Sequence, residues 1–512
     1  MNLSVRHIPA RLVLVGGLFV AGAFVMPADA APKPTQADAA AAPQSQAQAG
    51  SGQPSPVKCA DPRRTTAYRI QNETQARTSV KRAPVLCERR SRFHGAEPMA
   101  VVNSRGTVFL AAGASEEGDG LAAVVRSRDN GKTWQRRPLP EGFRPMTSSL
   151  AVDEVTDRLF FTSVGLNEEG CGSPVGYSDD EGTTWRLTTP RPGCGAPPTV
   201  GDWPKVFTGP YPGKPVGSYP RAVYYCNIGP GLLLNPEIGC WRSDDGGATF
   251  EFQSFLPTLP LVGACGTGVP GAVNHAAGRV DDAGVVRVPV LVCGRIGIMT
   301  SKDQAQTWSW TDVGASPFVG SVPVPQPDSP PLDTFFNGLI SNILDEDSEG
   351  NLYLTWVNRT VQLAVSIDHG KTWRVRSVSP PGLRANYPSV AANRGGEIAL
   401  SYMATPATGI EGEGHVWKAW MAHSANANAA RPVFSGGVIS EKPVFVTSGG
   451  SACCHGSSEE DSVIMTEMTG VAFAPDGAAW AGFVRFDQAG DGRAELIAGE
   501  LRLPGRTRSP VA

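Results

Sequence analysis

Four side chains that can exchange protons lie at the start of short apolar stretches spread along the chain: Glu97, Asp202, Glu467 and His275. Pairs of carboxylic acids perform general acid and base catalysis, and most enzymes that cleave glycosidic bonds use such a pair. Glu97, in Gly-Ala-Glu-Pro, is the first candidate for the acid, and Asp202, in Gly-Asp-Trp-Pro, is the second. Glu467 and His275 follow as further catalytic candidates.

Residues beside these four supply candidate binding groups. Trp203 follows Asp202 directly and offers an aromatic face on which a sugar ring can stack. Arg144, Arg384 and Tyr387 precede or open other apolar stretches and are further candidates for contacting a substrate. The alternative interpretation is that these polar groups satisfy the backbone at strand ends and hold water.

An eight-residue repeat indicates the elements that must bring these residues together. Ser-x-Asp-x-Gly-x-Thr-Trp occurs at Ser127–Trp134, and related copies follow at intervals of 51 to 65 residues. These copies are Ser178–Trp185, Ser243–Phe250, Ser301–Trp308 with Ala305 in place of glycine, Ser366–Trp373, and a degenerate copy that begins at Ser424. Repeats of this period predict a propeller, a solenoid or another array of small units.

The residue types of the repeat are those of a tight turn between two strands. An Asp accepts hydrogen bonds from the backbone N–H groups just ahead of it, and Gly two positions later supplies a positive φ. Thr suits the start of the next strand, and the final aromatic residue covers the hairpin. We therefore interpret Asp129, Asp180, Asp245, Asp303 and Asp368 as turn-forming residues rather than catalysts.

Five good copies of the octapeptide resemble the Asp-box, or BNR repeat, of sialidases and related β-propellers. The resemblance implies an all-β chain with a single β-propeller, whose Asp-boxes join the third and fourth strands of four-stranded blades. In that family the boxes lie on the face away from the active site. The stretch from Ser218 to Cys293 is also similar to a narrower group of secreted bacterial sialidase-like propellers.

The strand pattern predicts where the blades begin and how many there are. Apolar strands restart near Glu97, Ser148, Asp202, His275, Ser341, Asn386 and Thr469. Residues 59–505 divided by seven give about 64 residues per blade, close to the repeat interval, whereas six blades would need about 75. We therefore expect seven blades, with six as the alternative. The last set has three strands, and Thr66–Gln71 is expected to supply the fourth and close the ring.

The resemblance also implies an activity. Sialidases hold a substrate carboxylate with three arginines, and the assignment here is Arg92, Arg144 and Arg384. The expected function is a glycoside hydrolase, similar to an exo-α-sialidase, that acts on an extracellular glycan. The alternative is a non-catalytic propeller that binds a carbohydrate, a protein or another ligand of the cell envelope. Neither interpretation requires a cofactor, and the sequence does not indicate an oligomeric state.

Composition narrows the partners and the compartment. The 512 residues carry a net charge of −3, so no basic surface for nucleic acid is expected. Residues 1–30 read as a signal peptide with Arg6 and Arg11 ahead of an apolar run, which predicts secretion and no membrane span after cleavage. Residues 31–57 form an Ala/Pro/Gln-rich linker that cannot bury a core, residues 58–505 the propeller, and residues 506–512 a tail.

Ten cysteines in an exported chain predict disulfides. Proximity in the sequence pairs Cys59 with Cys87, Cys171 with Cys194, Cys226 with Cys240, and Cys265 with Cys293. Cys453 and Cys454 remain, and a vicinal disulfide between them is one outcome. A metal site that joins them to His455 is disfavoured, because zinc-binding cysteines are normally separated by at least two residues.

One acidic run resembles the start of a calcium-binding loop. It spans Asp345–Asn351, but its twelfth position is Trp356 instead of the glutamate that an EF-hand requires. We interpret it as an acidic hairpin between two strands, and we expect no metal site.

Overall fold

In the computed structural model the described residues form 35 strands joined by turns and loops, and no helix. Residues 1–30, predicted to be a signal peptide, lie outside the described residues, as do most of the predicted linker and the predicted tail. No described segment forms a helix that could cross a membrane. The described residues are 54–61, 65–71, 74–80, 83–95, 97–112, 123–140, 143, 148–163, 173–190, 202–228, 238–258, 273–292, 294–316, 318–319, 322–323, 342–406, 416–446, 469–486 and 494–504.

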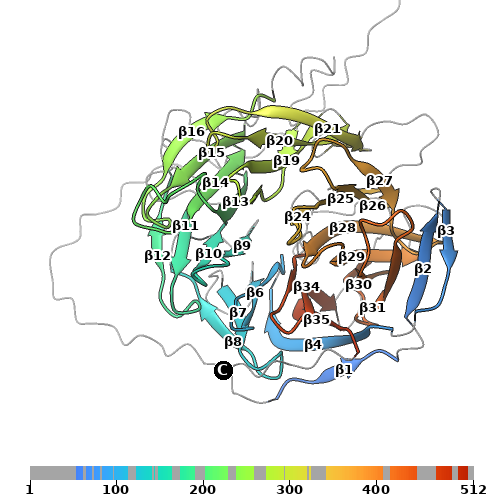
Figure 1. Cartoon of the computed structure of the whole chain (residues 1–512). Coiled ribbons are helices and arrows are strands. Elements are labelled where there is room, and N and C mark those ends of the chain that lie inside the picture. Colours follow the sequence, from blue (N-terminus) through green and yellow to red (C-terminus); the bar gives the residue numbers. More distant parts are fainter. Residues whose placement is uncertain are drawn as a thin grey trace, which may run out of the picture. The chain divides into compact units, whose positions relative to one another are not determined.

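Seven four-stranded antiparallel sheets follow one another around a common centre, which makes the fold a seven-bladed β-propeller (Figure 1). The prediction of seven blades is confirmed, and the six-bladed alternative is excluded. In blades 1 to 5 consecutive strands pair antiparallel, and the chain runs from the innermost strand outward.

The first five blades have the following strands. Blade 1 contains β5 (Ala100–Val102), β6 (Val108–Ala112), β7 (Ala123–Ser127) and β8 (Gln135–Pro138). Blade 2 contains β9 (Ser149–Val152), β10 (Leu159–Thr162), β11 (Val175–Ser178) and β12 (Arg186–Thr188). Blade 3 contains β13 (Asp202–Gly209), β14 (Ala222–Ile228), β15 (Ile238–Ser243) and β16 (Glu251–Phe255). Blade 4 contains β17 (Val273–His275), β18 (Arg279–Val280), β19 (Val286–Val292), β20 (Arg295–Ser301) and β21 (Ser309–Ala315), where β17 and β18 both pair with β19. Blade 5 contains β24 (Leu344–Glu346), β25 (Leu352–Asn358), β26 (Thr360–Ser366) and β27 (Arg374–Ser377).

The last two blades take strands from both parts of the chain. Blade 6 contains β28 (Leu383–Ala392), β29 (Ile398–Pro406), β30 (Val416–Ser424) and β31 (Val433–Val438), extended outward by β2 (Thr66–Gln71) and β3 (Thr74–Arg77). Blade 7 contains β33 (Val471–Phe473), β34 (Ala479–Phe486), β35 (Ala494–Arg502) and β4 (Val85–His94), with β1 (Val57–Cys59) at its edge. Smaller pairings are β32 (Phe445–Val446) with β30, and β22 (Phe318–Val319) with β23 (Val322–Pro323).

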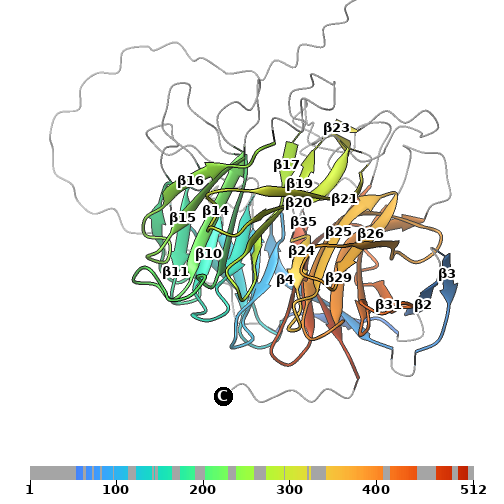
Figure 2. The ribbon, with the colours of Figure 1, turned by 45° about the horizontal axis from the view of Figure 1, so that its top comes forward.

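An N-terminal strand closes the ring, but it is not the predicted one. β4 pairs with β35 as the fourth strand of blade 7, whereas Thr66–Gln71 pairs with β31 on the outside of blade 6 (Figure 2). The correction has a physical reason: ten-residue β4 pairs along most of β35, while six-residue β2 buries Tyr68 and Ile70 in the core of blades 5 and 6. A disulfide between Cys59 and Cys87 joins β1 to β4.

The hydrophobic core is divided among the blade interfaces. The described residues form seven apolar clusters, one between each pair of neighbouring blades. Each blade therefore buries both faces, which explains the continuous apolar runs in the middle strands, such as Val286–Val292.

The five good octapeptides all form turns between the third and fourth strands, as predicted. In the third copy, Ser243 Oγ donates to Asp245 Oδ1 at 2.7 Å and accepts from the N–H of Gly247 at 2.8 Å. The N–H and hydroxyl of Thr249 donate to the two carboxylate oxygens of Asp245 at 2.9 and 2.6 Å. Equivalent bonds recur in the other four copies. In the fourth copy Ala305 adopts the glycine conformation, with φ of 72°.

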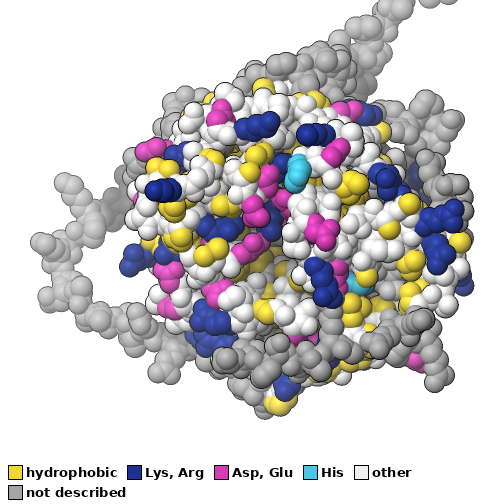
Figure 3. All heavy atoms as spheres, viewed as in Figure 1, with side chains coloured by type: hydrophobic (Ala, Val, Ile, Leu, Met, Phe, Trp, Pro, Cys, Tyr) yellow, Lys and Arg dark blue, Asp and Glu magenta, His cyan; other side chains and the backbone are white. Residues whose placement is uncertain are grey.

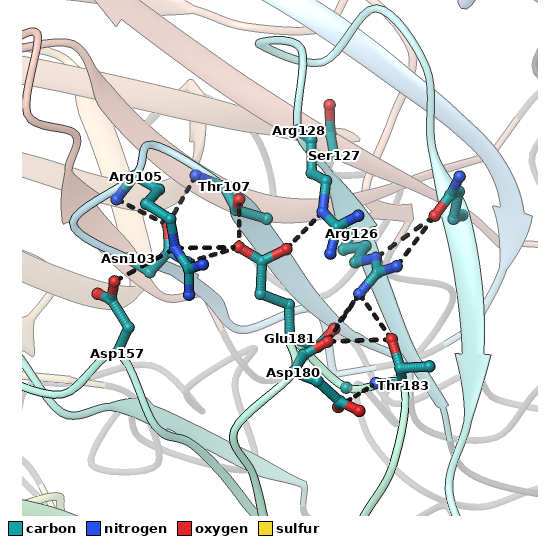
Figure 4. Close-up of polar contacts among 12 residues, drawn as sticks. Asn103, Arg105, Thr107, Arg126, Ser127, Arg128, Asp157, Asp180, Glu181 and Thr183 are labelled. Atoms are coloured by element: carbon teal, nitrogen blue, oxygen red, sulfur yellow. Dashed lines mark hydrogen bonds and ion pairs between the residues drawn. The ribbon is translucent and has the colours of Figure 1, made fainter. Parts of the chain in front are cut away.

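The same turns connect neighbouring blades. The carbonyl of Glu181, in the second octapeptide, accepts a 2.6 Å hydrogen bond from Nη1 of Arg126 in blade 1 (Figure 4). The carboxylate of Glu181 accepts bonds from Asn103 Nδ2, Thr107 Oγ1 and Arg128 Nε, also in blade 1. These bonds outweigh the cost of burying Glu181, and the pKa of its carboxyl is lowered as a result.

The carbonyl at this position of the repeat has the same role elsewhere in the ring. Gly246 of blade 3 accepts from Arg158 Nη1 of blade 2 at 2.7 Å, and His369 of blade 5 accepts from Arg287 Nη2 of blade 4 at 3.4 Å. The octapeptide therefore closes its own hairpin and also binds an arginine of the preceding blade.

Candidate functional site

Glu97, the first catalytic candidate, links two blades at the start of their innermost strands. Its side chain is buried, and Oε2 accepts the backbone N–H of Ser148 at 2.5 Å. Ser148 precedes β9 of blade 2, while Glu97 precedes β5 of blade 1. Glu97 also has a positive φ of 52°, an unusual conformation for a residue with a side chain.

His275 ends β17 and lies in a fully buried position beside Lys205 of blade 3. Burial and the positive charge of Lys205 lower the pKa of His275 to about 3, so its imidazole is neutral at ordinary pH. Its Nδ1 lies 3.2 Å from the carbonyl of Ala276. A neutral ring held in this way accepts a hydrogen bond more readily than it supplies a proton.

The candidate binding residues are distributed differently. Tyr387, with φ of 48°, packs in the apolar cluster between blades 6 and 7, and its carbonyl accepts from Thr469 Oγ1 at 2.7 Å. Arg384 lies near the start of β28 and is partly buried. Arg92 lies on β4, the outer strand of blade 7, where Nη2 donates to the carbonyl of Pro54 at 3.0 Å. The structure therefore does not bring Arg92 to the innermost strands.

The other candidates cannot be placed in the same detail. The backbone of Asp202 and Trp203 starts β13, an innermost strand, but their side chains are not among the described ones. Arg144 and Glu467 lie outside the described residues. Of the predicted disulfides, Cys59–Cys87 and Cys226–Cys240 are confirmed, while Cys171, Cys194, Cys265, Cys293, Cys453 and Cys454 lie outside the described part.

A set of charged residues that the sequence analysis did not group meets at the opposite end of the innermost strands. This channel-end cluster consists of Glu154, Arg279, Asp345 and Glu346. Glu154 follows the end of β9 in blade 2, Arg279 opens β18 in blade 4, and Asp345 and Glu346 end β24 in blade 5. Since innermost strands surround the centre of a propeller, these four residues from three blades lie at the end of its channel.

Arg279 is the centre of the channel-end cluster. Its Nη1 lies 2.7 Å from Glu154 Oε1, and its Nε lies 3.1 Å from Asp345 Oδ1. Asp345 is held by backbone donors as well: the N–H of Glu346 donates to Oδ1 at 2.9 Å and that of Ala392 to Oδ2 at 2.7 Å. Asp345 therefore fixes the guanidinium, and more than half of the Glu154 side chain remains exposed to solvent.

The carboxyl groups of the cluster have pKa values shifted in opposite directions. The charge of Arg279 lowers the pKa of Glu154, so this carboxylate is ionised. Burial raises the pKa of Glu346 to about 7, a value that nearby Asp281 and Asp282 help to raise and that Arg287 opposes. Burial also raises the pKa of Asp345, against the pull of Arg279. Acid and base groups of enzymes show this kind of separation.

Further ion pairs surround the cluster. Arg287 Nη1 lies 2.8 Å from Asp281 Oδ2, and Arg221 Nε lies 3.4 Å from Asp153 Oδ2. Figure 3 shows acidic and basic side chains gathered around the hollow at the centre of the ring, near the positions of β9 and β24 in Figure 1. Among the residues that the structure describes, no group of three or more metal-binding side chains occurs.

Comparisons with known proteins do not assign the chain to a family. No known protein family and no curated protein matches the sequence. Similar solved structures include a phage phi92 endosialidase, with 11% identity over 86% of this chain and 72% of that one, at a TM-score of 0.41. A Hadza microbial sialidase is 14% identical over 68% of this chain and 66% of its own, at a TM-score of 0.39. The GH93 α-L-arabinofuranosidase of Fusarium graminearum, solved with arabinobiose, is 12% identical over 81% and 97%, also at 0.39.

These neighbours are sialidases and another glycoside hydrolase, and the likeness concerns the fold alone. A signal for the channel-end cluster was nevertheless present in the sequence. Arg279 lies four residues after His275, and Asp345–Asn351 is predicted to be an acidic hairpin. The hairpin is confirmed at Asp347, whose carboxylate accepts from the N–H groups of Glu349 and Asn351. The charged residues that meet in the structure lie at the ends of innermost strands, whereas the predicted candidates lie at their starts.

Proposed function

We propose that the protein is a secreted glycoside hydrolase with a sialidase-like propeller, acting on an extracellular glycan at the channel-end cluster. The observation that supports this most is the placement of Glu154 and Asp345 on two nitrogens of one guanidinium, whose charge also acts on Glu346, the residue after Asp345. The 2.7 and 3.1 Å contacts bring carboxyl groups from two separate blades to one site that solvent reaches.

The proposed roles follow from the protonation states. Glu346, with a pKa of about 7, keeps its proton near neutral pH and serves as the general acid toward the glycosidic oxygen. Glu154, ionised beside Arg279, acts as the base or nucleophile. Asp345 is a positioning residue, since it holds Arg279 through Nε while backbone N–H groups hold its own oxygens.

Three finer assignments belong to the same proposal. The eight-residue turns are Asp-boxes of the sialidase-like kind, on the basis of their sequence and of their place between third and fourth strands. Residues 1–30 are a signal peptide, which agrees with the disulfides Cys59–Cys87 and Cys226–Cys240. Glu97, Asp202, Glu467 and His275 remain candidates for a site at the other end of the channel. That end is the one away from the eight-residue turns, where sialidases have their active site, whereas the channel-end cluster lies on the same face as the turns: Arg287 contacts both Asp281 and the octapeptide residue His369.

A panel of chromogenic glycosides of both anomeric configurations tests the proposal. We expect Glu346→Gln and Glu154→Gln each to lower kcat/KM by about 10²–10⁴, the range of general acid–base catalysis. Matched variants at the other end, Glu97→Gln and Asp202→Asn, should retain activity. A loss confined to these two variants would move the reaction centre to the starts of the innermost strands, and no turnover of any glycoside would exclude the enzyme.

One observation favours a second function, a propeller that binds a glycan without cleaving it. Glu154 and Asp345 are both engaged by Arg279, so neither carboxylate is free before a ligand arrives. Titration of unlabelled oligosaccharides into the protein distinguishes the two functions. Saturable binding that Arg279→Met abolishes, with no product after long incubation, would support the binding function.

A further inference from the structure

Every arginine at the channel end that the structure describes is already paired with a carboxylate. Arg279 contacts Glu154 and Asp345 at 2.7 and 3.1 Å. Arg287 contacts Asp281 at 2.8 Å, and its side chain is only 6% exposed. The third arginine of this end, Arg221, lies 3.4 Å from Asp153, whose side chain is fully buried.

Carboxyl groups exceed guanidinium groups at this end. Beyond the carboxylates that pair with arginines, Glu346 of β24 and the exposed Asp282 contribute two more. Both lie close enough to influence one another, since the charge of Asp282 raises the pKa of Glu346. Once the ion pairs are formed, the remaining potential at the channel end is negative, and a positively charged ligand lowers its energy there.

We propose, as an extension of the proposed function, that the channel-end cluster selects an amino sugar over a neutral sugar and disfavours an acidic one. A carboxylated or sulfated sugar would need a guanidinium that is taken from its present partner, which leaves a carboxylate unpaired in a half-buried place. An ammonium group instead meets the exposed carboxylate of Asp282 and the carboxylates of Glu154 and Asp345, which share one guanidinium. A neutral sugar neither displaces an ion pair nor gains an ionic contact. Its preference should therefore lie between those for the amino sugar and the acidic sugar.

The charge on the substrate is the variable to isolate. Three chromogenic glycosides with the gluco configuration serve: the 2-amino-2-deoxyglucoside, the glucoside and the glucuronide, each in both anomeric forms. We expect kcat/KM to fall in that order, with steps of about tenfold at low salt, the size expected for one partly screened charge contact. At about 0.5 M salt the steps should shrink, because screening shortens the range of these interactions.

Variants outside the proposed catalytic groups assign the selectivity to this end of the channel. Asp282→Asn removes an exposed carboxylate, and we expect the ratio of kcat/KM for the amino glycoside to kcat/KM for the glucoside to fall several-fold. The matched control is Asp312→Asn, since Asp312 is exposed on β21 and pairs with Arg295 away from the innermost strands. The control should leave all three values unchanged.

The outcomes separate this inference from the function on which it rests. Preference for the glucuronide, or equal effects of Asp282→Asn and Asp312→Asn, would overturn the selectivity while leaving a hydrolase. If no glycoside is cleaved, the hydrolase fails, and equilibrium titration with glucosamine, glucose and glucuronic acid tests selectivity in its place. Tightest binding of glucosamine would keep the inference, and absent binding or tightest binding of glucuronic acid would reject it.

Discussion

Arg279 and Asp345 face each other across the boundary between blades 4 and 5, with Nε of the arginine 3.1 Å from Oδ1 of the aspartate. The same guanidinium reaches Glu154 of blade 2 at 2.7 Å. One side chain therefore joins three blades at the end of the channel. The mutual attraction holds Arg279 protonated, because the charge of Asp345 raises its pKa further above the ordinary range.

Activity should depend on pH in a way that the two glutamates define. Glu346 must keep its proton, so kcat/KM should fall as pH rises through about 7, the pKa of this carboxyl. Glu154 must be ionised, and its lowered pKa keeps activity high down to pH values below the ordinary 4.5 of a glutamate. A rate profile from pH 3 to 9 checks both limbs. A flat profile across pH 7 would remove Glu346 from the acid role.

The stability of the folded protein should also report Glu346. Its pKa rises from 4.5 to about 7 on folding, so the folded state binds more protons between these values. The contribution of Glu346 to stability is therefore greatest below pH 4.5 and is lost as pH rises to about 7. We expect Glu346→Gln to have a Tm that falls less than that of the wild type over this window. Parallel Tm curves for the two proteins would contradict the shift.

Removing the arginine that binds the second octapeptide should destabilise the ring. Arg126→Met leaves the carbonyl of Glu181 without its 2.6 Å donor in a buried interface, which costs about 1–3 kcal/mol of unfolding free energy. Arg105→Met is the control, since Arg105 is 57% exposed and its contacts with Asp157 and Glu181 are long, at 3.4 and 3.6 Å. Such exposed pairs contribute about 0–1 kcal/mol. Chemical denaturation of both variants measures the difference, and equal losses would refute the inter-blade role.

Glu97 can be tested for structure and catalysis separately. Glu97→Ala removes the acceptor of the buried Ser148 N–H, and we expect a loss of about 1–3 kcal/mol in unfolding free energy. Glu97→Gln keeps an acceptor oxygen and should be close to the wild type in stability. If Glu97→Gln is stable but inactive, the original assignment of Glu97 as a catalytic acid is supported instead.

The disulfide between Cys59 and Cys87 should contribute measurably to stability. It closes a loop with a sequence separation of 28 and holds β1 against the strand that completes blade 7. A loop of this length predicts a loss of about 3–4 kcal/mol in the double variant Cys59→Ser/Cys87→Ser. Because this variant lacks the bond between residues 59 and 87, reductant cannot lower its Tm by opening that bond. An unchanged Tm in the double variant would show that β4 holds its place without the link.

Much of the architecture was predictable because the strands of most blades follow one another directly in the sequence. The octapeptide from Ser243 to Phe250 carries its own Asp, Gly and Thr, so it forms a turn wherever the chain places it. The number of blades, seven, follows from dividing the length of residues 59–505 by the interval between octapeptides. The closing strand was assigned wrongly because Thr66–Gln71 and Val85–His94 both read as strands, and only pairing with β35 or β31 distinguishes them.

The sequence by itself determined the features that depend on residues close together in the chain. These are the turns, the strands, the number of blades and the pairing of Cys226 with Cys240. Which side chains meet at the channel is a different matter. Glu154, Arg279 and Asp345 come from blades 2, 4 and 5, and no spacing along the chain encodes their contact. Only the closure of the ring brings them together, because it places the ends of innermost strands from separate blades around the same channel.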